Sequence, residues 1–239
     1  ELNLKTKKNN IIDAMVMGIY DWALIVDHLN KKSYMVSMMI DSQTKFIWPD
    51  LIQIFNKEID SKFKEFKIKN TVRNNLSFQE YKNKFNKVMN YINAGDCYQI
   101  NLSKQFDVET QGDSWSLYKK FRDVNKSPFM AYLLYDEFEI LCGSPERFIK
   151  SEGGKVTTRP IKGTRARGKD KAIDKKNANE LLNSIKDQSE NLMIVDLLRN
   201  DLSINCEIGS VKVDELFTIE SYPNVHHLVS TISGDLKNG

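Results

Sequence analysis

The chain has 239 residues, of which 41% are apolar, so it is long enough and hydrophobic enough to bury a core. Lys and Arg number 35 against 32 Asp and Glu and are scattered along the chain, which argues against a nucleic-acid-binding surface. No run approaches the roughly 18 apolar residues of a membrane span. Cys97, Cys142 and Cys206 lack the spacing of a disulfide framework or a zinc site. We therefore expect a cytoplasmic protein without nucleic-acid or membrane partners.

The N-terminal segment predicts a hairpin followed by a helix. Residues 20–37 contain two strand-like runs, and Asn30-Lys31-Lys32 between them is typical of a turn. A helix is expected over residues 49–60, with Pro49 in its first turn, where proline is favoured.

The clearest helix is expected over residues 78–94. Ser77 and Glu80 have the spacing of a capping box, apolar residues recur at helical spacing, and Gly95 provides a stop. Residues 98–102 then alternate apolar and polar side chains, which predicts a half-buried strand.

The remainder of the chain alternates strand-like pairs with helical segments. Short connections between the paired runs indicate antiparallel pairing. We therefore expect an α+β fold with largely antiparallel sheets and flanking helices. The expected segments are a short helix around 115–121, strands at 129–135, 138–142, 147–151 and 155–159, a loop at 165–171, a helix over about 176–198 and strands from residue 208 onward.

A carboxyl group follows one of these strands, in Ser144-Pro145-Glu146-Arg147-Phe148. At the end of a buried strand, a carboxyl group can hold its proton and act as a general acid. An ion pair with a nearby arginine would explain Glu146 equally simply.

A lysine occurs in a constrained segment, Arg159-Pro160-Ile161-Lys162-Gly163-Thr164. Pro160 fixes its own φ angle, and Gly163 lets the backbone approach a ligand, so a loop here would present Lys162. Close to other cations, such a lysine can be neutral and act as an amine nucleophile. A solvated surface lysine is the alternative.

Two further segments carry acidic and imidazole groups. Asp187 and Glu190 lie three residues apart on a predicted helix, a spacing that suits Mg²⁺ but also an ordinary solvated helix face. His226 and His227 are adjacent in an extended segment, so their side chains point to opposite faces and at most one of them faces a given site.

Taken in order, these segments resemble the signature blocks of the chorismate-binding enzyme family. The resemblance implies an anthranilate-synthase-like fold, here an incomplete fragment formed by the central part of one catalytic domain. Residues 1–70 would be a remnant of the N-terminal region, and residues 71–239 the chorismate-binding core. The matching blocks are Gly95 to Leu102, Ser144 to Phe148, Arg159 to Thr164, Glu190 to Asp201 and His226 to Ser230.

The resemblance also implies a reaction. Glu146 aligns with the general acid that protonates the leaving hydroxyl of chorismate. Lys162 is typical of the aminodeoxychorismate branch, in which its amine forms a covalent adduct at C2 so that ammonia enters at C4 and gives 4-amino-4-deoxychorismate. The positive charge of Arg159, Arg165 and Arg167 would favour the neutral amine. In the anthranilate branch, alanine is typical at this position and ammonia adds at C2.

Further site residues follow from the same resemblance. Asp187 and Glu190 would lie near Mg²⁺, and His227 matches a site histidine of the anthranilate branch. Gly163 and Thr164 would contact the substrate. Relatives of this branch also bind L-tryptophan in a non-catalytic pocket, and Pro128, Phe129 and Met130 align with one wall of that pocket.

The expected partners are chorismate and a glutamine amidotransferase subunit that supplies ammonia, with a separate lyase releasing pyruvate later. Relatives continue into further segments that hold more of the site, so we expect the isolated chain to be inactive. Two alternatives remain. The chain could be an anthranilate synthase component I, or a degenerate binding module without catalysis.

Overall fold

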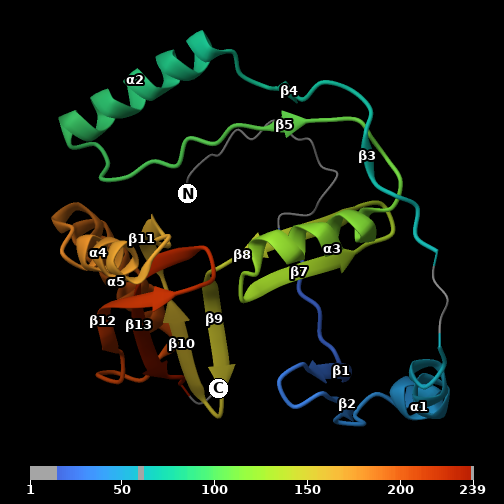
Figure 1. Cartoon of the computed structure of the whole chain (residues 1–239). Helices are drawn as coiled ribbons and strands as arrows, with labels where there is room; N and C mark the ends of the chain where they lie inside the picture. The colour runs from blue at the N-terminus through green and yellow to red at the C-terminus, as the bar shows by residue number, and fades with distance from the viewer. Residues whose placement is uncertain (1–14, 59–61, 238–239) are drawn as a thin grey trace. The chain divides into compact units, whose positions relative to one another are not determined.

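The computed structural model describes residues 15–58 and 62–237. Its contacts divide the chain into two compact units, Glu1–Lys62 and Phe63–Gly239. The first unit contains a hairpin of β1 (Trp22–Asp27) and β2 (Lys32–Ser37), which pair antiparallel with Trp22 opposite Ser37. This confirms the hairpin predicted over residues 20–37 (Figure 1).

The helix that follows, α1 (Ser42–Phe55), begins earlier than the sequence predicts. The Asp41 side chain accepts a hydrogen bond from the Gln43 amide at 2.8 Å and caps the first turn. Pro49 therefore lies inside the helix, where it removes one hydrogen-bond donor, instead of opening it. The prediction that the helix starts at Pro49 is wrong because the capping side chain, not the proline, determines the start.

Helix α2 (Phe78–Ala94) has both ends where the sequence places them. Ser77 Oγ accepts from the Glu80 amide at 3.2 Å, and a Glu80 carboxylate oxygen accepts from the Ser77 amide at 2.8 Å. Gly95 ends the helix with φ +80°, a left-handed conformation that glycine adopts without strain. The capping-box prediction is confirmed.

The strand predicted at residues 98–102 is absent from the described part of the chain. Tyr98 is 87% exposed, and strand pairing in this region starts only at Phe106. An alternating pattern forms a strand only where a second strand supplies backbone partners. The short strands here are β3 (Lys67–Ile68) with β6 (Thr110–Gln111), and β4 (Arg73–Asn74) with β5 (Phe106–Asp107).

Helix α3 (Ser114–Asn125) packs against a second hairpin, β7 (Phe129–Leu134) and β8 (Glu139–Ser144). The Asp113 side chain caps α3 by accepting from the Trp115 amide at 2.8 Å. Tyr118, at 7% exposure, lies against Trp115 and Tyr132. The predicted helix and strand pair are both confirmed.

The main sheet is built around the long strand β13 (Val225–Asp235). On one edge it pairs with β12 (Lys212–Ser221), and on the other with two consecutive strands, β10 (Lys155–Arg159) and β11 (Ile161–Ala166). Only Pro160 separates β10 from β11, and the Pro160 carbonyl accepts from the Ser230 amide at 3.2 Å. Segment 155–166 therefore follows one edge of β13 along nearly its whole length.

A tight hairpin joins β10 to β9 (Arg147–Glu152), which pairs with the outer edge of β10. Gly153 and Gly154 connect the two strands with φ angles of +57° and +77°. Two successive positive φ angles match the twist of the flanking strands, so this glycine pair suits the turn. The predicted hairpin through these glycines is confirmed.

The single helix expected over about 176–198 is instead two helices, α4 (Lys171–Leu182) and α5 (Ile185–Asn205). Asn183 ends α4, and Ser184 caps α5 by accepting from the Asp187 amide at 3.3 Å. The loop predicted at 165–171 is also shorter than expected, because strand pairing with β13 extends β11 as far as Ala166.

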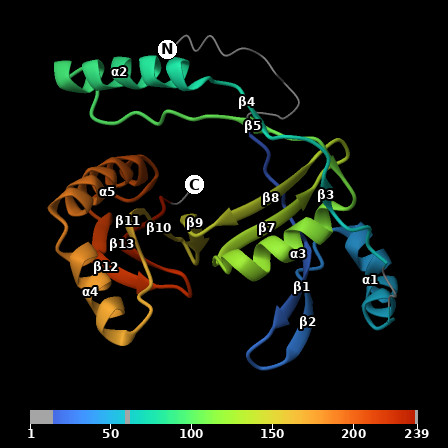
Figure 2. The ribbon, with the colours of Figure 1, turned by 45° about the horizontal axis from the view of Figure 1, so that its top comes forward.

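Helices α4 and α5 lie against one face of the main sheet (Figure 2). Val195 and Leu202 of α5 pack with Val156 of β10 and Ile232 of β13 in a buried cluster that also contains Cys206. Burying one such aliphatic side chain stabilises the fold by about 1.5 to 3 kcal/mol. The core therefore fixes α5 against the strands that carry the candidate site residues.

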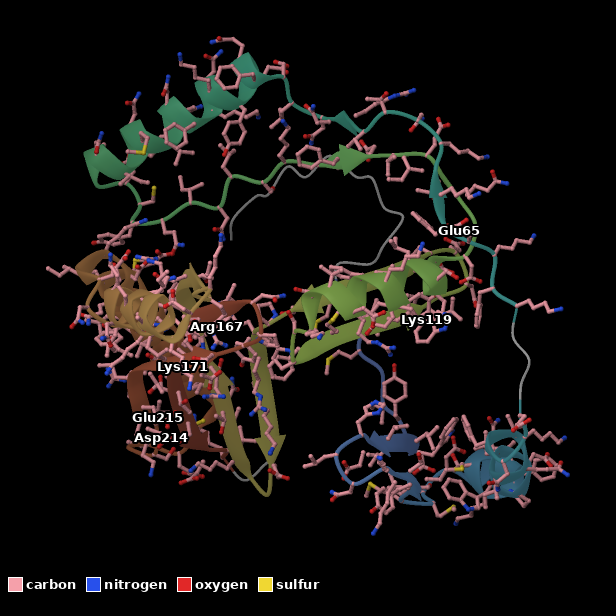
Figure 3. The ribbon with its side chains drawn as sticks, viewed as in Figure 1. Glu65, Lys119, Arg167, Lys171, Asp214 and Glu215 are labelled. Carbon is pink, nitrogen blue, oxygen red and sulfur yellow. The ribbon has the colours of Figure 1, made fainter. Side chains whose placement is uncertain are left out.

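The carboxylate of Asp174 ties α4 to this sheet. It accepts from Arg167 at 2.7 Å, from the Gly168 amide at 2.7 Å and, through the same oxygen, lies 3.0 Å from Nε2 of His226. Figure 3 labels Arg167 beside the main sheet. The Arg167 guanidinium and the Gly168 amide hold the pKa of Asp174 well below its usual range.

We predict a specific acid sensitivity from this cluster. Because the folded-state pKa is lowered, Asp174 stabilises the fold above the ordinary aspartate pKa of about 3.9, and this contribution is lost as the pH falls further. Asp174→Asn should lower stability at neutral pH and flatten the dependence below about pH 4. Urea unfolding at several pH values measures both effects. Asp196→Asn, which removes an exposed ion pair with Arg199, is the control and should change neither.

Candidate active site

Glu146 lies in the connection between β8 and β9, beside the start of β11. Its Oε1 accepts from the Ile161 amide at 2.9 Å. Strand β9 begins one residue later, at Arg147, which pairs with Arg159, so the Glu146 carboxylate takes the position of the next strand partner. Among the described residues, Oε2 of Glu146 has no hydrogen-bond partner.

Lys162 and Gly163 form a bulge in β11. Ile161 pairs with Val229 and Thr164 with His227, so three steps along β11 match two steps along β13. A bulge adds one residue to a strand and re-aims the side chains at that point. The sequence predicted a loop at Lys162, whereas the structure has an irregular strand, because hydrogen bonding to β13 continues on both sides of the bulge.

Gly163 brings α5 unusually close to β11. Its φ angle is +79°, and a Cβ atom added there would lie 2.8 Å from Leu181 Cδ1 and 2.9 Å from both Cβ and Cγ of Asp187. Only a residue without a side chain fits this position. The glycine thus lets the buried Asp187 side chain, in a residue 6% exposed, lie directly against the backbone between Lys162 and Thr164.

His227 is held from the neighbouring strand by Thr164. Its Nδ1 lies 2.9 Å from Thr164 Oγ1, and the two residues are directly opposite each other in the ladder. His227 is 7% exposed, and burial lowers the pKa of its imidazole, while the charges of Glu220 and Glu146 act in the opposite direction. The His227 ring is therefore influenced by two carboxylates from different segments, Glu220 of β12 and Glu146 of the β8–β9 connection.

The candidate residues approach β11 from opposite faces of the sheet. His226 bonds to α4 through Asp174, and Ser230 bonds to Asn191 of α5 at 2.6 Å, so the even-numbered positions of β13 face the helices. Strand alternation puts His227 on the other face. This confirms the prediction that the two histidines point in opposite directions.

The expected excess of positive charge around Lys162 is not found. The three arginines near it in sequence each pair with a carboxylate, so their charge is compensated. Nearby arginines therefore do not by themselves explain a neutral lysine amine, and that part of the sequence interpretation is wrong. The pairs are Arg159 with Glu220, Arg165 with Asp187 at 3.0 Å and Glu180 at 3.1 Å, and Arg167 with Asp174 at 2.7 Å.

Asp187 and Glu190 share one face of α5, as their spacing predicts. Asp187 is bonded to Arg165, whereas Glu190 forms no ion pair within the described residues. In the part of the chain that the structure describes, no group of three or more His, Cys, Asp or Glu side chains could hold a metal ion. Mg²⁺ commonly takes one or two carboxylates and completes its shell with water and substrate, and of this pair Glu190 is the one without an ion pair among the described residues.

The residues expected to form a tryptophan wall lie at the start of β7. Pro128 directly precedes the strand, Phe129 is 37% exposed, and Met130 is half-buried. The Arg147 guanidinium lies 5.4 Å from the centre of the Phe129 ring, a cation–π contact.

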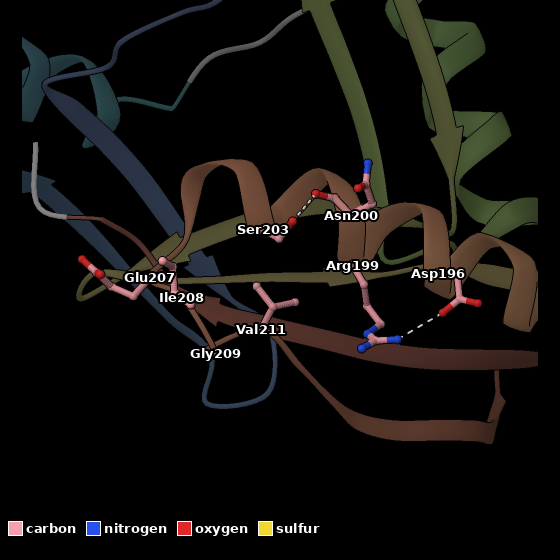
Figure 4. A pocket seen from close by; sticks show the side chains of 8 residues that line it. All are labelled: Asp196, Arg199, Asn200, Ser203, Glu207, Ile208, Gly209 and Val211. Carbon is pink, nitrogen blue, oxygen red and sulfur yellow. Dashed lines mark hydrogen bonds and ion pairs between the residues drawn. The ribbon is translucent and has the colours of Figure 1, made fainter.

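Two hollows lie near these elements. One, of about 210 Å³, is lined by Pro145, the residue before Glu146, and by Tyr222 and His227. The other, of about 410 Å³, lies between the end of α5 and the start of β12 and is lined by Arg199, which pairs with Asp196 (Figure 4). The larger hollow contains none of the predicted site residues, so we place the candidate site at the smaller one.

Some residues of this site were not singled out by the sequence. Glu220 and Tyr222 are joined by a hydrogen bond of 2.7 Å from the tyrosine hydroxyl, and the Tyr222 ring centre lies 5.6 Å from that of His227. Asn191 and Ser230 are fully buried between α5 and β13. The sequence signal for these residues is the spacing of Glu220 and Tyr222, two positions apart in a strand-like segment before His227. This spacing places them near His227 only once the pairing of β12 with β13 is known.

The family model of chorismate binding enzymes matches residues 1–239. The chain belongs to the chorismate-binding enzyme family. Aminodeoxychorismate synthase component 1 of Salmonella typhimurium is 42% identical over 222 residues, which cover 93% of this chain and 47% of that protein. The protein of the same name from Escherichia coli is 42% identical over 228 residues, covering 95% and 48%.

More distant members of the chorismate-binding family also match. Anthranilate synthase alpha subunit 1 of Arabidopsis thaliana is 33% identical over 246 residues, covering 94% of this chain and 41% of that protein. The crystal structure of anthranilate synthase component I from Streptococcus pneumoniae matches with a TM-score of 0.73 and 25% identity, covering 91% and 49%. The predicted anthranilate-synthase-like α+β fold is confirmed. The chain spans about half the length of these relatives.

We predict that Gly163→Ala destabilises the fold more than the same substitution at Gly209. A β-carbon would impose the strain of a positive φ angle, about 1 to 3 kcal/mol, and would also clash with Asp187 and Leu181. Gly209→Ala is the matched control, because Gly209 has φ +80° but open space around it. Urea unfolding should show a larger loss for Gly163→Ala. Equal losses would contradict the close packing of Gly163 against Asp187 and Leu181.

Proposed function

We propose that this chain forms the chorismate-binding core of an aminase that converts chorismate and ammonia to 4-amino-4-deoxychorismate and water. The proposal is supported by membership of the chorismate-binding family and by the 42% identity to proteins named aminodeoxychorismate synthase component 1. The single observation that carries it is Lys162 at a bulge whose next ladder residue, Thr164, contacts His227.

Lys162 gives the proposed reaction its regiochemistry. Its neutral amine attacks C2 of chorismate, both ring double bonds shift, and the C4 hydroxyl leaves as water with a proton from Glu146. Ammonia then attacks C4, both double bonds return to their original positions, and the C2–nitrogen bond to Lys162 breaks. The lysine recovers its amine, and the net change is replacement of hydroxyl by amine at C4.

Other residues orient the substrate and move protons in this proposal. Gly163 and Thr164 bring backbone close to the ligand, and His227 exchanges a proton with the incoming or departing amine. Asp187 and Glu190 would hold Mg²⁺, which supplies positive charge for a substrate carboxylate when bound. Release of Asp187 from Arg165, or use of its second oxygen, would free it for this role.

We further propose a cytoplasmic location and a glutamine amidotransferase partner as the ammonia source. Pro128, Phe129 and Met130 would contribute to an L-tryptophan pocket. Among residues 15–58 and 62–237, no helix is both long and apolar enough to cross a membrane. Residues 71–239 would form the chorismate-binding core and residues 1–70 part of the preceding region.

The competing function is that of anthranilate synthase, which the 33% identity to the Arabidopsis subunit supports. We favour the aminodeoxychorismate reaction because an amine at position 162 can occupy C2. A binding module without catalysis would have no need to keep Glu146 and Lys162 on adjoining segments.

Product analysis of Lys162→Ala tests this choice. The protein from the complete reading frame is incubated with chorismate, Mg²⁺ and ammonium, and products are separated and identified by mass. We expect 4-amino-4-deoxychorismate from the unmodified protein, and a loss of that product or its diversion to anthranilate in Lys162→Ala. Lys169→Ala, an exposed lysine in the loop after β11, is the control and should leave the product unchanged. Anthranilate from the unmodified protein would instead support the competing function.

A second prediction concerns the proton donor. Glu146→Gln keeps the hydrogen bond from the Ile161 amide, because the amide side chain still offers an oxygen acceptor, but it removes the acidic proton. We expect the turnover rate to fall by about 10² to 10⁴ with the product unchanged. Steady-state rates provide the measurement, and turnover within about twofold of the unmodified protein would exclude Glu146 as the general acid.

A further inference from the structure

We propose that Glu220, held in place by Arg159 and Tyr222, is a positioning residue that sets the orientation and charge state of His227. This inference deepens the proposed function, because it concerns a histidine that we assign to proton transfer. It rests first on the ladder between β12 and β13.

Glu220 lies directly opposite His227 in the antiparallel ladder. Directly opposite residues have side chains on the same face, with Cβ atoms about 4.5 to 5.5 Å apart. Two irregularities in β12 precede this pair, and at the second of them Phe217 has φ +58° and donates its amide to Ser230 Oγ at 3.2 Å. The bulge thus shifts the register so that a carboxylate, rather than a neighbouring side chain, faces the imidazole.

The Glu220 carboxylate is fixed on both of its oxygens. Oε1 accepts a charge-assisted hydrogen bond from the Arg159 guanidinium, and Oε2 accepts from the Tyr222 hydroxyl at 2.7 Å. Arg159 is itself held by Thr231 Oγ1 at 3.1 Å. A carboxylate with a hydrogen bond to each oxygen loses the rotational freedom that an exposed glutamate has. Its charge therefore has a defined position relative to His227.

Tyr222 contacts His227 as well as Glu220. The two ring centres are 5.6 Å apart with planes inclined at 58°, and both residues line the hollow beside Pro145. Because Nδ1 of His227 also bonds to Thr164 of β11, its ring is restrained from that strand and from the residue directly after β12. Tyr222 therefore connects the position of the carboxylate to the position of the imidazole.

The groups that face His227 come from three elements. Strand β12 contributes Glu220, and Tyr222 follows directly after that strand. Strand β11 contributes Thr164 and the backbone of Gly163, and the β8–β9 connection contributes Glu146. Burial lowers the pKa of His227, and Glu220 is the largest influence in the opposite direction. Removal of that negative charge leaves Arg159 with only the more distant Glu215, at 3.8 Å, and should lower the His227 pKa further, since both changes disfavour the imidazolium.

Titration of the His227 ring by NMR tests the inference without chorismate. The signal is assigned by its loss in His227→Gln. In Glu220→Gln we expect the His227 pKa to fall by about one pH unit, a tenfold loss of proton affinity. The matched control is Glu215→Gln, whose position on the main sheet is labelled in Figure 3. Glu215 lies on the same strand and 3.8 Å from Arg159, but it pairs with Thr231. Glu215→Gln should leave the His227 titration unchanged.

Two further variants separate charge from packing. Glu220→Asp keeps the charge, so its His227 titration should lie closer to that of the unmodified protein than does that of Glu220→Gln. If Glu220→Gln does not fold, the double variant Glu220→Gln with Arg159→Gln leaves neither partner uncompensated and should still show the lowered value. An unchanged titration in these variants, or an equal fall in Glu215→Gln, would overturn the inference.

The outcome is independent of whether the proposed function is correct. If chorismate is not aminated but Glu220→Gln lowers the His227 pKa, the pairing is real and only the reaction is wrong. If amination occurs and the His227 pKa is unchanged in Glu220→Gln, the reaction stands and Glu220 has no role in setting the charge state of His227. In the amination assay, Glu220→Gln should move the limb of the pH–rate profile that depends on His227 to lower pH.

Discussion

Backbone pairing along both edges of β13 is the constraint on which the site depends. Because β10 and β11 follow one edge and β12 the other, residues from distant parts of the chain acquire fixed partners. His227 is thereby placed between Thr164 and Glu220. The packing of α5 on the other face holds this strand in place through a buried apolar cluster. The residues of the proposed site are thus brought together by sheet register rather than by one contiguous motif.

Irregularities in that pairing occur at residues that we propose for catalysis. The bulge at Lys162 and Gly163 interrupts an otherwise regular edge, and the missing side chain at Gly163 admits Asp187 from the helical face. Acid–base groups and the carboxylates that we propose for Mg²⁺ therefore approach the same few backbone atoms from opposite faces.

Local signals in the sequence predict local structure well here. The capping box at Ser77 and the paired glycines at 153–154 act through neighbouring atoms, and both predictions are confirmed. The strand expected at 98–102 fails because its formation requires a distant partner, and the helix expected from Pro49 starts earlier because of a side chain outside the predicted range. Arginine pairing and the role of Glu220 depend on tertiary contacts, which spacing alone does not encode.

The most direct test of the account is a crystal structure of the complete protein with chorismate and Mg²⁺ bound. We predict that the chorismate ring lies beside Glu146, Lys162 and His227, with the metal ion against Glu190 or Asp187. Chorismate bound instead in the hollow lined by Asp196 and Arg199, or out of reach of Lys162, would contradict the central claim that the β13 register assembles the catalytic site.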